Sequence, residues 1–480
     1  MSDAKQWNVL IMCPDQLRAD YLSCYGHASI ETKHIDGLAA EGVRFERVYC
    51  AAPLCGPSRI SFVTSTRFSE HNHRNYGSTV DYRVPNLVRS LKAAGYRTGM
   101  FGKNHCFNHG QLKGIWDELD EICLGNYDDH PKYKRSFDAF PLENDHDYNI
   151  TGRLTDETIG FISRQPADRP WLAWVNWQDP HPAFTCPEPY FSMFDPAKIE
   201  LPTWYREGGG SGKPKRLANW QVNSLAAEAT EADIRQAIAA YMGQVRYVDD
   251  SVGRLLDALR ETGRDKDTLV VFISDHGEML GSQGAFHKIG VFYDCLTRIP
   301  VIIRHPQGCY KGVFRGLVEE VDLAPTILEA CGVKKPPSFV GESLHERLVG
   351  GKLGVEHGRK TALVETGLQA PTWPGPVGEN QKAPFAPNNF GVGAMVTDGR
   401  YKLTVYQDDV CELYDLQTDP DELRNRFEDP ELKDIRERLT LELCKRLLGV
   451  GVRDIGQVRW PERHDPRDTP MEIAAILNDE

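Results

Sequence analysis

Acidic, basic and imidazole side chains follow several apolar runs of this chain at the point where each run ends. The clearest case is the β-branched run Thr268 to Ile273, which leads directly to Asp275 and His276. Three more runs end in the same way, with Asp15 and Gln16, with Lys103 and His105, and with Asp179 and His181. Buried parallel strands consist of continuous apolar runs, and open α/β sheets bind their ligands at the carboxyl ends of such strands. We therefore expect carboxylates, imidazoles and an ammonium to share one ligand site.

Helical patterns separate these apolar runs. Residues Pro85 to Ala94 and the longer stretch Glu231 to Thr262 have the spacing of amphipathic helices. Alternating strands and helices predict an α/β sandwich around a mostly parallel central sheet, with Thr361 to Thr366 as the last strand of that sheet. The segment Gly208 to Pro214 is predicted to be a surface loop. It is not a phosphate-binding P-loop, because its glycine spacing is wrong and a proline follows the lysine.

The composition changes after this last predicted strand. Residues 368–390 are rich in Pro, Gly and Asn, which indicates a linker or a loop on the substrate side. Two β-rich runs around Asp398 and Gly399 predict a hairpin over 393–406. Glu412 to Leu416 adds a third short strand, and Pro430 to Leu448 predicts a helix with Asp429 as its N-cap. We expect a catalytic domain over 1–368 and a small α+β subdomain with an antiparallel sheet over 390–480.

Composition and charge exclude several classes of function. The 480 residues are 40% hydrophobic and 26% charged, an ordinary globular balance. The net charge of -13 argues against broad binding to nucleic acid or to an anionic membrane surface, so an anionic substrate needs a local basic pocket. The first residues have no apolar targeting segment, so we expect a cytoplasmic chain, with a removed signal peptide left open. The twelve cysteines form no C-x-x-C pair and are expected to be reduced, and a homo-oligomer is left open.

The segment Cys55 to Arg59 has the form Cys-x-Pro-Ser-Arg. A cysteine in a turn with proline is commonly a small buried residue without reactivity. Together with the polar strand ends, and with Glu412 to Leu416 followed by Asp419 and Pro420, the segment resembles the type I sulfatases of the alkaline phosphatase superfamily over nearly the whole chain. In that family a maturation enzyme oxidises the cysteine to formylglycine, whose hydrated aldehyde carries the attacking hydroxyl. The resemblance implies an alkaline phosphatase-like fold and an enzyme that hydrolyses sulfate monoesters, arylsulfatases included.

The resemblance also implies one divalent metal. Its ligand positions are matched by Asp15, Gln16, Asp275 and His276, with the modified Cys55 as a further ligand. Ligands rich in oxygen favour calcium, with magnesium and manganese as alternatives. The commonest pattern of the family has aspartate where this chain has Gln16, so one negative charge is missing and the metal should be held less tightly or differ in identity. Taken alone, Asp15 and Gln16 also fit a polar strand end or a helix cap.

The other roles that the resemblance implies concern the ester. Arg59 and Lys103 would hold the formylglycine and one ester oxygen, and His105 would be the base that later releases sulfate. Lys288 and His181 would bind sulfate oxygens and protonate the leaving alcohol. Asn75 is a further candidate substrate contact, whereas His71 and His73 are interpreted as loop or pocket residues despite their H-x-H spacing.

Two alternatives to sulfate ester hydrolysis stay open. A related branch hydrolyses phosphonate monoesters or phosphodiesters with the same modified cysteine and also carries Asp-Gln at the first metal pair. Lys103 and His105 favour the sulfatase, because that branch usually has Tyr and Thr there. The second alternative is a catalytically silent binding protein, which would require Cys55 to remain a thiol. The alcohol part of a small-molecule or carbohydrate sulfate ester cannot be inferred from the residues.

Overall fold

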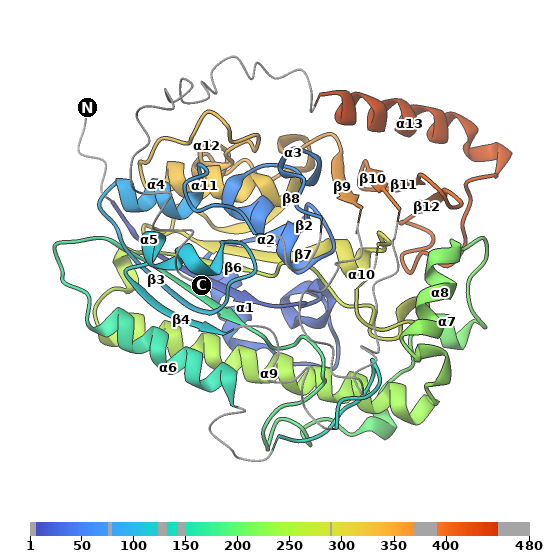
Figure 1. Cartoon of the computed structure of the whole chain (residues 1–480), viewed down its shortest axis with the longest axis horizontal. Helices are drawn as coiled ribbons and strands as arrows, with labels where there is room; N and C mark the ends of the chain where they lie inside the picture. The colour runs from blue at the N-terminus through green and yellow to red at the C-terminus, as the bar shows by residue number, and fades with distance from the viewer. Residues whose placement is uncertain are drawn as a thin grey trace, which may run out of the picture. The chain divides into compact units, whose positions relative to one another are not determined.

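The computed structural model describes residues 6–74, 79–122, 132–142, 149–288, 290–367 and 391–449. The predicted linker at 368–390 and the candidate contact Asn75 lie outside these residues. The chain divides into a compact unit Met1–Leu443 and a second unit Cys444–Glu480. The first unit contains an eight-stranded sheet and a four-stranded sheet (Figure 1).

The strands and helices have the following bounds. The strands are β1 Asn8–Pro14, β2 Val43–Tyr49, β3 Arg97–Lys103, β4 Glu118–Ile122, β5 Trp171–Trp177, β6 Thr268–Ile273, β7 Arg298–Arg304, β8 Gly312–Glu319, β9 Ala362–Thr366, β10 Gly393–Thr397, β11 Tyr401–Tyr406 and β12 Glu412–Asp415. The helices are α1 Lys33–Glu41, α2 Cys55–Thr64, α3 Phe68–His71, α4 Leu87–Ala93, α5 Leu112–Ile115, α6 Ile150–Ser163, α7 Thr203–Arg206, α8 Lys215–Asn223, α9 Glu231–Glu261, α10 Asp294–Thr297, α11 Leu323–Ala330, α12 His345–Val349 and α13 Lys433–Leu448.

The large sheet is mostly parallel, as predicted. Its strand order is β4-β3-β5-β1-β6-β7-β2-β8. The central strand β1 pairs in parallel with β5 and β6, and β3 pairs in parallel with β5 and β4. The strand β7 runs antiparallel to both of its neighbours, β6 and β2. The four strands β3, β5, β1 and β6 are therefore adjacent and point in one direction, which brings their carboxyl ends together.

Helices cover both faces of the large sheet. Along β1, Val9 and Ile11 pack into one hydrophobic core, and Leu10 and Met12 pack into the other, because successive side chains of a strand point to opposite faces. The first core includes residues of α2, α4 and α11, and the second includes residues of α1, α6 and α9 (Figure 1). Burying each of these aliphatic side chains contributes about 1.5–3 kcal/mol. A register slip of one residue would exchange the two faces, so the alternation fixes how β1 sits in the sheet.

The prediction that residues 361–366 form the last strand of the large sheet was wrong, because this strand belongs to the small sheet. As β9 it pairs antiparallel with β10, with Ala362 opposite Thr397 at one end and Thr366 opposite Gly393 at the other. The small sheet has the order β12-β11-β10-β9. Val364 packs into the first core of the large sheet, while Leu363 packs into a separate cluster with α13. Because β9 is buried on both faces, its apolar sequence fits either sheet, and only its hydrogen-bonding partner distinguishes them.

The other predicted elements of the C-terminal part are confirmed. The hairpin over 393–406 is β10 and β11, and the third strand is β12. The Asp429 side chain caps a short 3-10 turn, Pro430–Leu432, which leads into α13. The division into domains 1–368 and 390–480 stays a prediction. No helix within the described residues is long and apolar enough to cross a membrane.

Candidate active site

Residues from four adjacent strand ends meet at one edge of the large sheet. Asp15 follows β1, Lys103 ends β3, His181 lies beyond β5 and Asp275 follows β6. All four side chains are buried, with at most 6% of the residue surface exposed. The strand order therefore brings together the polar residues that the sequence analysis placed at strand ends.

The thiol of Cys55 lies in the middle of this cluster, at the N-terminus of α2. Its Sγ is 3.1 Å from His276 Nε2, and it is 3.7 Å from both Lys103 Nζ and an Asp15 carboxylate oxygen. Burial and Asp15 oppose ionisation of the thiol, yet Lys103, Lys288 and His276 outweigh them and lower its pKa below the usual value. The helix N-terminus also favours a negative group.

Other buried cysteines nearby behave differently. Burial raises the pKa of Cys106 to about 12 and raises the pKa of Cys50 well above its usual value. A lowered thiol pKa in a cationic setting distinguishes a reactive cysteine from an inert buried one. The surroundings of Cys55 therefore differ from those of the inert buried cysteines.

Arg59, one turn after Cys55, joins all four of the strand ends. Its Nε is 2.9 Å from an Asp275 carboxylate oxygen, and its Nη2 is 3.2 Å from Asp15 Oδ2. Its Nη1 donates to Asn176 Oδ1 at 2.6 Å and to the backbone oxygen of Lys103 at 3.2 Å. Arg59 is only 1% exposed, so these contacts occupy most of its donors. In this structure it neutralises and orients the two carboxylates, rather than presenting a free cation to a substrate.

Two further buried cations, Lys103 and Lys288, contact Asp15 and Gln16. Lys103 Nζ is 2.7 Å from Asp15 Oδ2, and Lys288 Nζ donates to the side-chain oxygen of Gln16. Burial opposes ionisation of Asp15, but Lys103, Arg59 and Lys288 outweigh it and hold its pKa well below the usual range. The ionised Asp15 and the two buried ammonium groups form the local basic setting that an anionic substrate requires in a chain of net negative charge.

Two histidines at the edge of the cluster are neutral in the free site. Burial, Lys103 and Arg59 lower the pKa of His105, and burial, Lys288 and Lys103 lower the pKa of His181, in both cases well below the usual value. His181 Nδ1 contacts the backbone oxygen of Pro182 at 2.5 Å, so this nitrogen carries the proton and Nε2 is free of it. Buried His105 Nδ1 has no hydrogen-bond partner among the described residues. Both imidazoles can therefore accept a proton.

The predicted metal ligands other than Gln16 lie close together. One donor atom from each of Asp15, Cys55, Asp275 and His276 lies within 4.8 Å of the others. His276 Nδ1 contacts the Gly277 backbone oxygen at 2.8 Å, so it carries the proton and leaves Nε2 as a donor for a metal. Two carboxylates and one imidazole suit a divalent cation. His71 and His73 are not in this group, and His71 Nε2 contacts Ser61 Oγ at 2.9 Å instead.

Two buried glutamates support the site and received no role from the sequence. Glu278 accepts hydrogen bonds from the Gln16 side chain and from two backbone N–H groups. Glu320 accepts from Ala51 N at 2.9 Å and from Ser58 Oγ at 2.7 Å, and so ties the loop before Cys55 to the first turn of α2. The position of Glu278 directly after Asp275, His276 and Gly277 could have indicated a role in the site. Glu320 follows β8, and no motif in the sequence connects it with Cys55.

Replacing Glu320 by glutamine should flatten the pH dependence of stability. Burial raises the pKa of Glu320 to about 8, so its favourable contribution is complete below an ordinary glutamate pKa and is lost as the pH rises towards 8. Glutamine stays neutral, can accept from Ala51 N and can donate to Ser58 Oγ. Between about pH 5 and pH 9, Glu320→Gln should gain at least about 1.4 kcal/mol relative to wild type, the equivalent of one pKa unit. Thermal unfolding across this range is the measurement. The exposed Glu437→Gln is the control, and parallel curves for wild type and Glu320→Gln would contradict the expectation.

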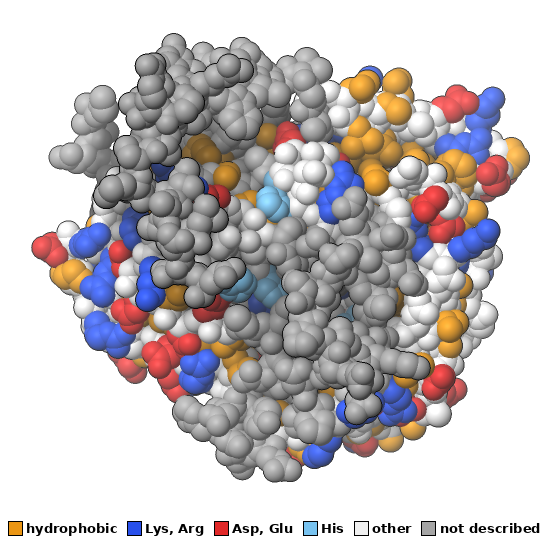
Figure 2. Space-filling model, in the orientation of Figure 1, with side chains coloured by type: hydrophobic (Ala, Val, Ile, Leu, Met, Phe, Trp, Pro, Cys, Tyr) orange, Lys and Arg blue, Asp and Glu red, His pale blue; other side chains and the backbone are white. Residues whose placement is uncertain are grey.

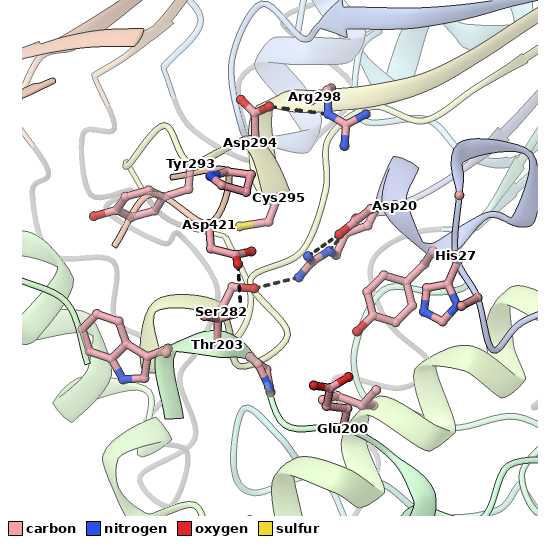
Figure 3. A pocket seen from close by; sticks show the side chains of 18 of the residues that line it. Asp20, His27, Glu200, Thr203, Ser282, Tyr293, Asp294, Cys295, Arg298 and Asp421 are labelled. Atoms are coloured by element: carbon pink, nitrogen blue, oxygen red, sulfur yellow. Dashed lines mark hydrogen bonds and ion pairs between the residues drawn. The ribbon is translucent and has the colours of Figure 1, made fainter. Parts of the chain in front are cut away.

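On the face drawn in Figure 2, blue and red side chains of the described residues are interspersed, and histidine side chains gather near its centre. A large cavity of about 1070 Å³ lies elsewhere (Figure 3). Arg18 donates there to Asp20 and Ser282, and Arg298 pairs with Asp294 at 3.5 Å. None of the predicted site residues lines this cavity, so it is separate from the cluster around Cys55.

Comparison with known proteins matches most of the chain. A model of the Sulfatase family matches residues 7–333, and one described as N-sulphoglucosamine sulphohydrolase, C-terminal, matches residues 387–447. An arylsulfatase of Clostridium perfringens is 26% identical, over 92% of this chain and 94% of its own length. An uncharacterised sulfatase of Escherichia coli is 28% identical, over 91% of this chain and 86% of its own. The solved structure of a phosphonate monoester hydrolase from Silicibacter pomeroyi is 28% identical, covers 92% of this chain and 96% of its own, and has a TM-score of 0.73.

Proposed function

Because the chain belongs to the sulfatase family and is a hydrolase of sulfate esters, we propose that it cleaves sulfate monoesters with residue 55 as the nucleophile, after a maturation enzyme has oxidised this cysteine to formylglycine. The observation that carries the proposal is the position of the Cys55 thiol, buried between His276, Lys103 and Asp15. A thiol held among cations with a lowered pKa is suited to reaction rather than to packing.

Two groups complete the proposed site. The hydrated aldehyde of formylglycine supplies the attacking hydroxyl at position 55. A divalent cation, calcium by preference, supplies Lewis-acid polarisation of the ester and would be held by Asp15, Gln16, Asp275 and His276 with residue 55. The fit rests on the carboxylate and imidazole donors, which are already close together.

The side chains of the chain itself bind the ester and move protons. Lys103 and Lys288 are placed to stabilise negative charge on the sulfate oxygens, which is usually the largest catalytic contribution. His181 would protonate the alcohol oxygen as its bond to sulfur breaks. The pKa of His181 is low in the free site, and the negative charge of a bound sulfate ester raises it again, because an opposite charge nearby favours the imidazolium. His105 would accept the proton of residue 55 as sulfate is released.

The names of the relatives indicate several different alcohol parts in their substrates. Relatives include proteins named arylsulfatase, choline-sulfatase and N-acetylglucosamine-6-O-sulfatase, which differ in that part. The common element is a sulfate ester of a small molecule or a carbohydrate. We therefore propose this class as the substrate.

Phosphonate monoester hydrolysis is the second candidate function. Two solved phosphonate monoester hydrolases have a TM-score of 0.73, equal to that of a structure with a bound sulfated glucosamine, whose 22% identity shows the fold alone. Fold similarity therefore does not separate the two reactions. Lys103 and His105 favour the sulfatase, since the lysine lies 3.7 Å from Cys55 Sγ and the histidine provides a neutral base.

An aryl sulfate should be a better substrate than the matching aryl phosphonate monoester. We expect a kcat/KM for the sulfate that is higher by at least about tenfold, which corresponds to about 1.4 kcal/mol of transition-state stabilisation. Both compounds release the same phenol, so one absorbance assay measures both rates. A preference for the phosphonate would assign the chain to the alternative function.

The variant His105→Ala tests the same assignment from the enzyme side. Loss of a general base lowers turnover by about 10²–10⁴-fold. Because the proposed base acts after the alcohol has left, the variant should release one equivalent of phenol in a burst and then stall. Normal steady-state turnover by His105→Ala would contradict the sulfatase assignment of this residue.

A further inference from the structure

Glu278 is a buried carboxylate that contacts a predicted metal ligand without being one of the clustered donors. It is fully buried, and it is not part of the group formed by Asp15, Cys55, Asp275 and His276. Its two oxygens have different partners. Oε1 accepts from Leu280 N at 3.0 Å and from His287 N, and Oε2 accepts from the side-chain nitrogen of Gln16. All three partners are N–H donors, so both oxygens of Glu278 act as acceptors.

The side-chain amide of Gln16 is held between an anion and a cation. Its nitrogen donates to Glu278, and its oxygen accepts from Lys288 Nζ. If the amide were flipped, its oxygen would face the carboxylate and its NH2 group would face the ammonium, and neither contact is a hydrogen bond. The two neighbours therefore fix which end of the amide carries the oxygen.

The backbone of Gln16 is held as firmly as its side chain. Gln16 N donates to Asp275 Oδ1 at 3.0 Å, and the Tyr241 hydroxyl donates to the Gln16 backbone oxygen at 2.9 Å. The residue has a φ of 67°, in the left-handed region that non-glycine residues rarely adopt. With both its backbone and its amide fixed, Gln16 can present its oxygen in one direction only, towards Lys288.

We propose that Glu278 is a positioning residue that fixes the orientation of the Gln16 amide, so that the oxygen of this amide, and not its NH2 group, is available to a metal at the cluster. The inference rests on the proposed function, since it requires a divalent cation at the cluster. An amide oxygen is a metal ligand, whereas an amide NH2 group is not. Outer partners that orient a ligand typically change metal affinity by about 10–100-fold.

The variant Glu278→Gln separates this role from a structural one. The glutamine keeps an oxygen for the N–H groups of Leu280 and His287, so the loop retains its hydrogen bonds. Its NH2 group, however, faces the NH2 group of Gln16, which is then driven to flip and to present a donor to Lys288. We expect calcium affinity to fall by about 10–100-fold, while the thermal unfolding temperature measured without metal stays close to that of the parent.

Exchanging the two side chains provides the rescue. In Gln16→Glu/Glu278→Gln, the amide of residue 278 donates to a carboxylate at residue 16, and the other oxygen of that carboxylate faces Lys288. The double variant should bind calcium at least as tightly as the parent. The single variant Gln16→Glu places two carboxylates against each other and should be the least stable of the set. A structural role for Glu278 predicts no such rescue.

The experiment is calorimetric titration of calcium chloride into the full chain, with manganese chloride as a second probe. All variants are made without a maturation enzyme, and mass spectrometry checks that residue 55 is the same thiol in each. Glu412→Gln is the buried-glutamate control, since Glu412 accepts from the hydroxyls of Tyr293 and Tyr406 and has no contact with the clustered donors among its hydrogen bonds. Weak binding by Glu278→Gln with recovery in the double variant supports the proposal. Parent-like binding by Glu278→Gln, or failure of the double variant to recover, overturns it. A folded parent that binds neither cation refutes the proposed metal centre itself, and this result is distinguishable from the other two.

Discussion

Cys55→Ala should abolish turnover of sulfate esters while the protein stays folded and still binds substrate. The substitution removes the only side chain that can become the proposed nucleophile, and it leaves Arg59, Lys103 and Lys288 in place. We expect a loss of at least about 10⁴-fold in kcat, the size of effect that follows removal of a covalent nucleophile. Steady-state kinetics with an aryl sulfate measures the loss, and calorimetry with the same ester measures retained binding.

Mass spectrometry of the peptide that contains residue 55 completes this test. Protein made together with a competent maturation enzyme should carry an aldehyde there. Cys50→Ala is the matched control, since Cys50 is also fully buried, burial raises its pKa, and its thiol lies 3.9 Å from the backbone oxygen of Leu296. Full activity in protein whose Cys55 remains a thiol would refute the proposed mechanism.

The parts of the site that the sequence predicted are those fixed by sheet topology. Asp15, Lys103, His181 and Asp275 each follow an apolar run, and parallel strands must bring such ends to one edge. The central β1 is buried on both faces, so its continuous apolar run identifies it without further information. Local sequence therefore determined both the strand and the place of the polar residue that follows it.

Features that depend on long-range pairing could not be predicted in this way. The strand β9 has the same apolar pattern as a strand of the large sheet. It pairs, however, with β10, which follows it in the sequence only after residues 368–390. The ion pairs of Arg59 with Asp15 and Asp275 join it to residues that follow β1 and β6, far away in sequence. Glu320 illustrates the same limit, because its contacts with Ala51 and Ser58 exist only in the folded chain.

Asp275→Ala should remove both the metal and the activity. One oxygen of Asp275 accepts from Gln16 N and His276 N, each at 3.0 Å, and the other accepts from Arg59 Nε at 2.9 Å. Alanine therefore deletes a metal donor and also releases the loop of Gln16 from the loop of His276. It leaves buried Arg59 with Asp15 as its one carboxylate partner among the described residues, an unfavourable charge balance.

The expected result for Asp275→Ala is loss of bound metal in elemental analysis and a kcat below detection, and removal of metal from wild type by a chelator should have the same effect on kcat. Asp322→Asn is a control at another buried carboxylate, which accepts from the N–H groups of Glu319 and Glu342 and pairs with Arg359. It should keep the metal and the activity. Full activity of metal-free wild type would exclude a Lewis-acid role, and zinc at full occupancy would contradict the preference for a hard cation, since zinc selects nitrogen and sulfur donors. Asp275 contacts Gln16, His276 and Arg59 directly. We therefore expect Asp275→Ala to reduce kcat more than removal of any one of these three side chains does.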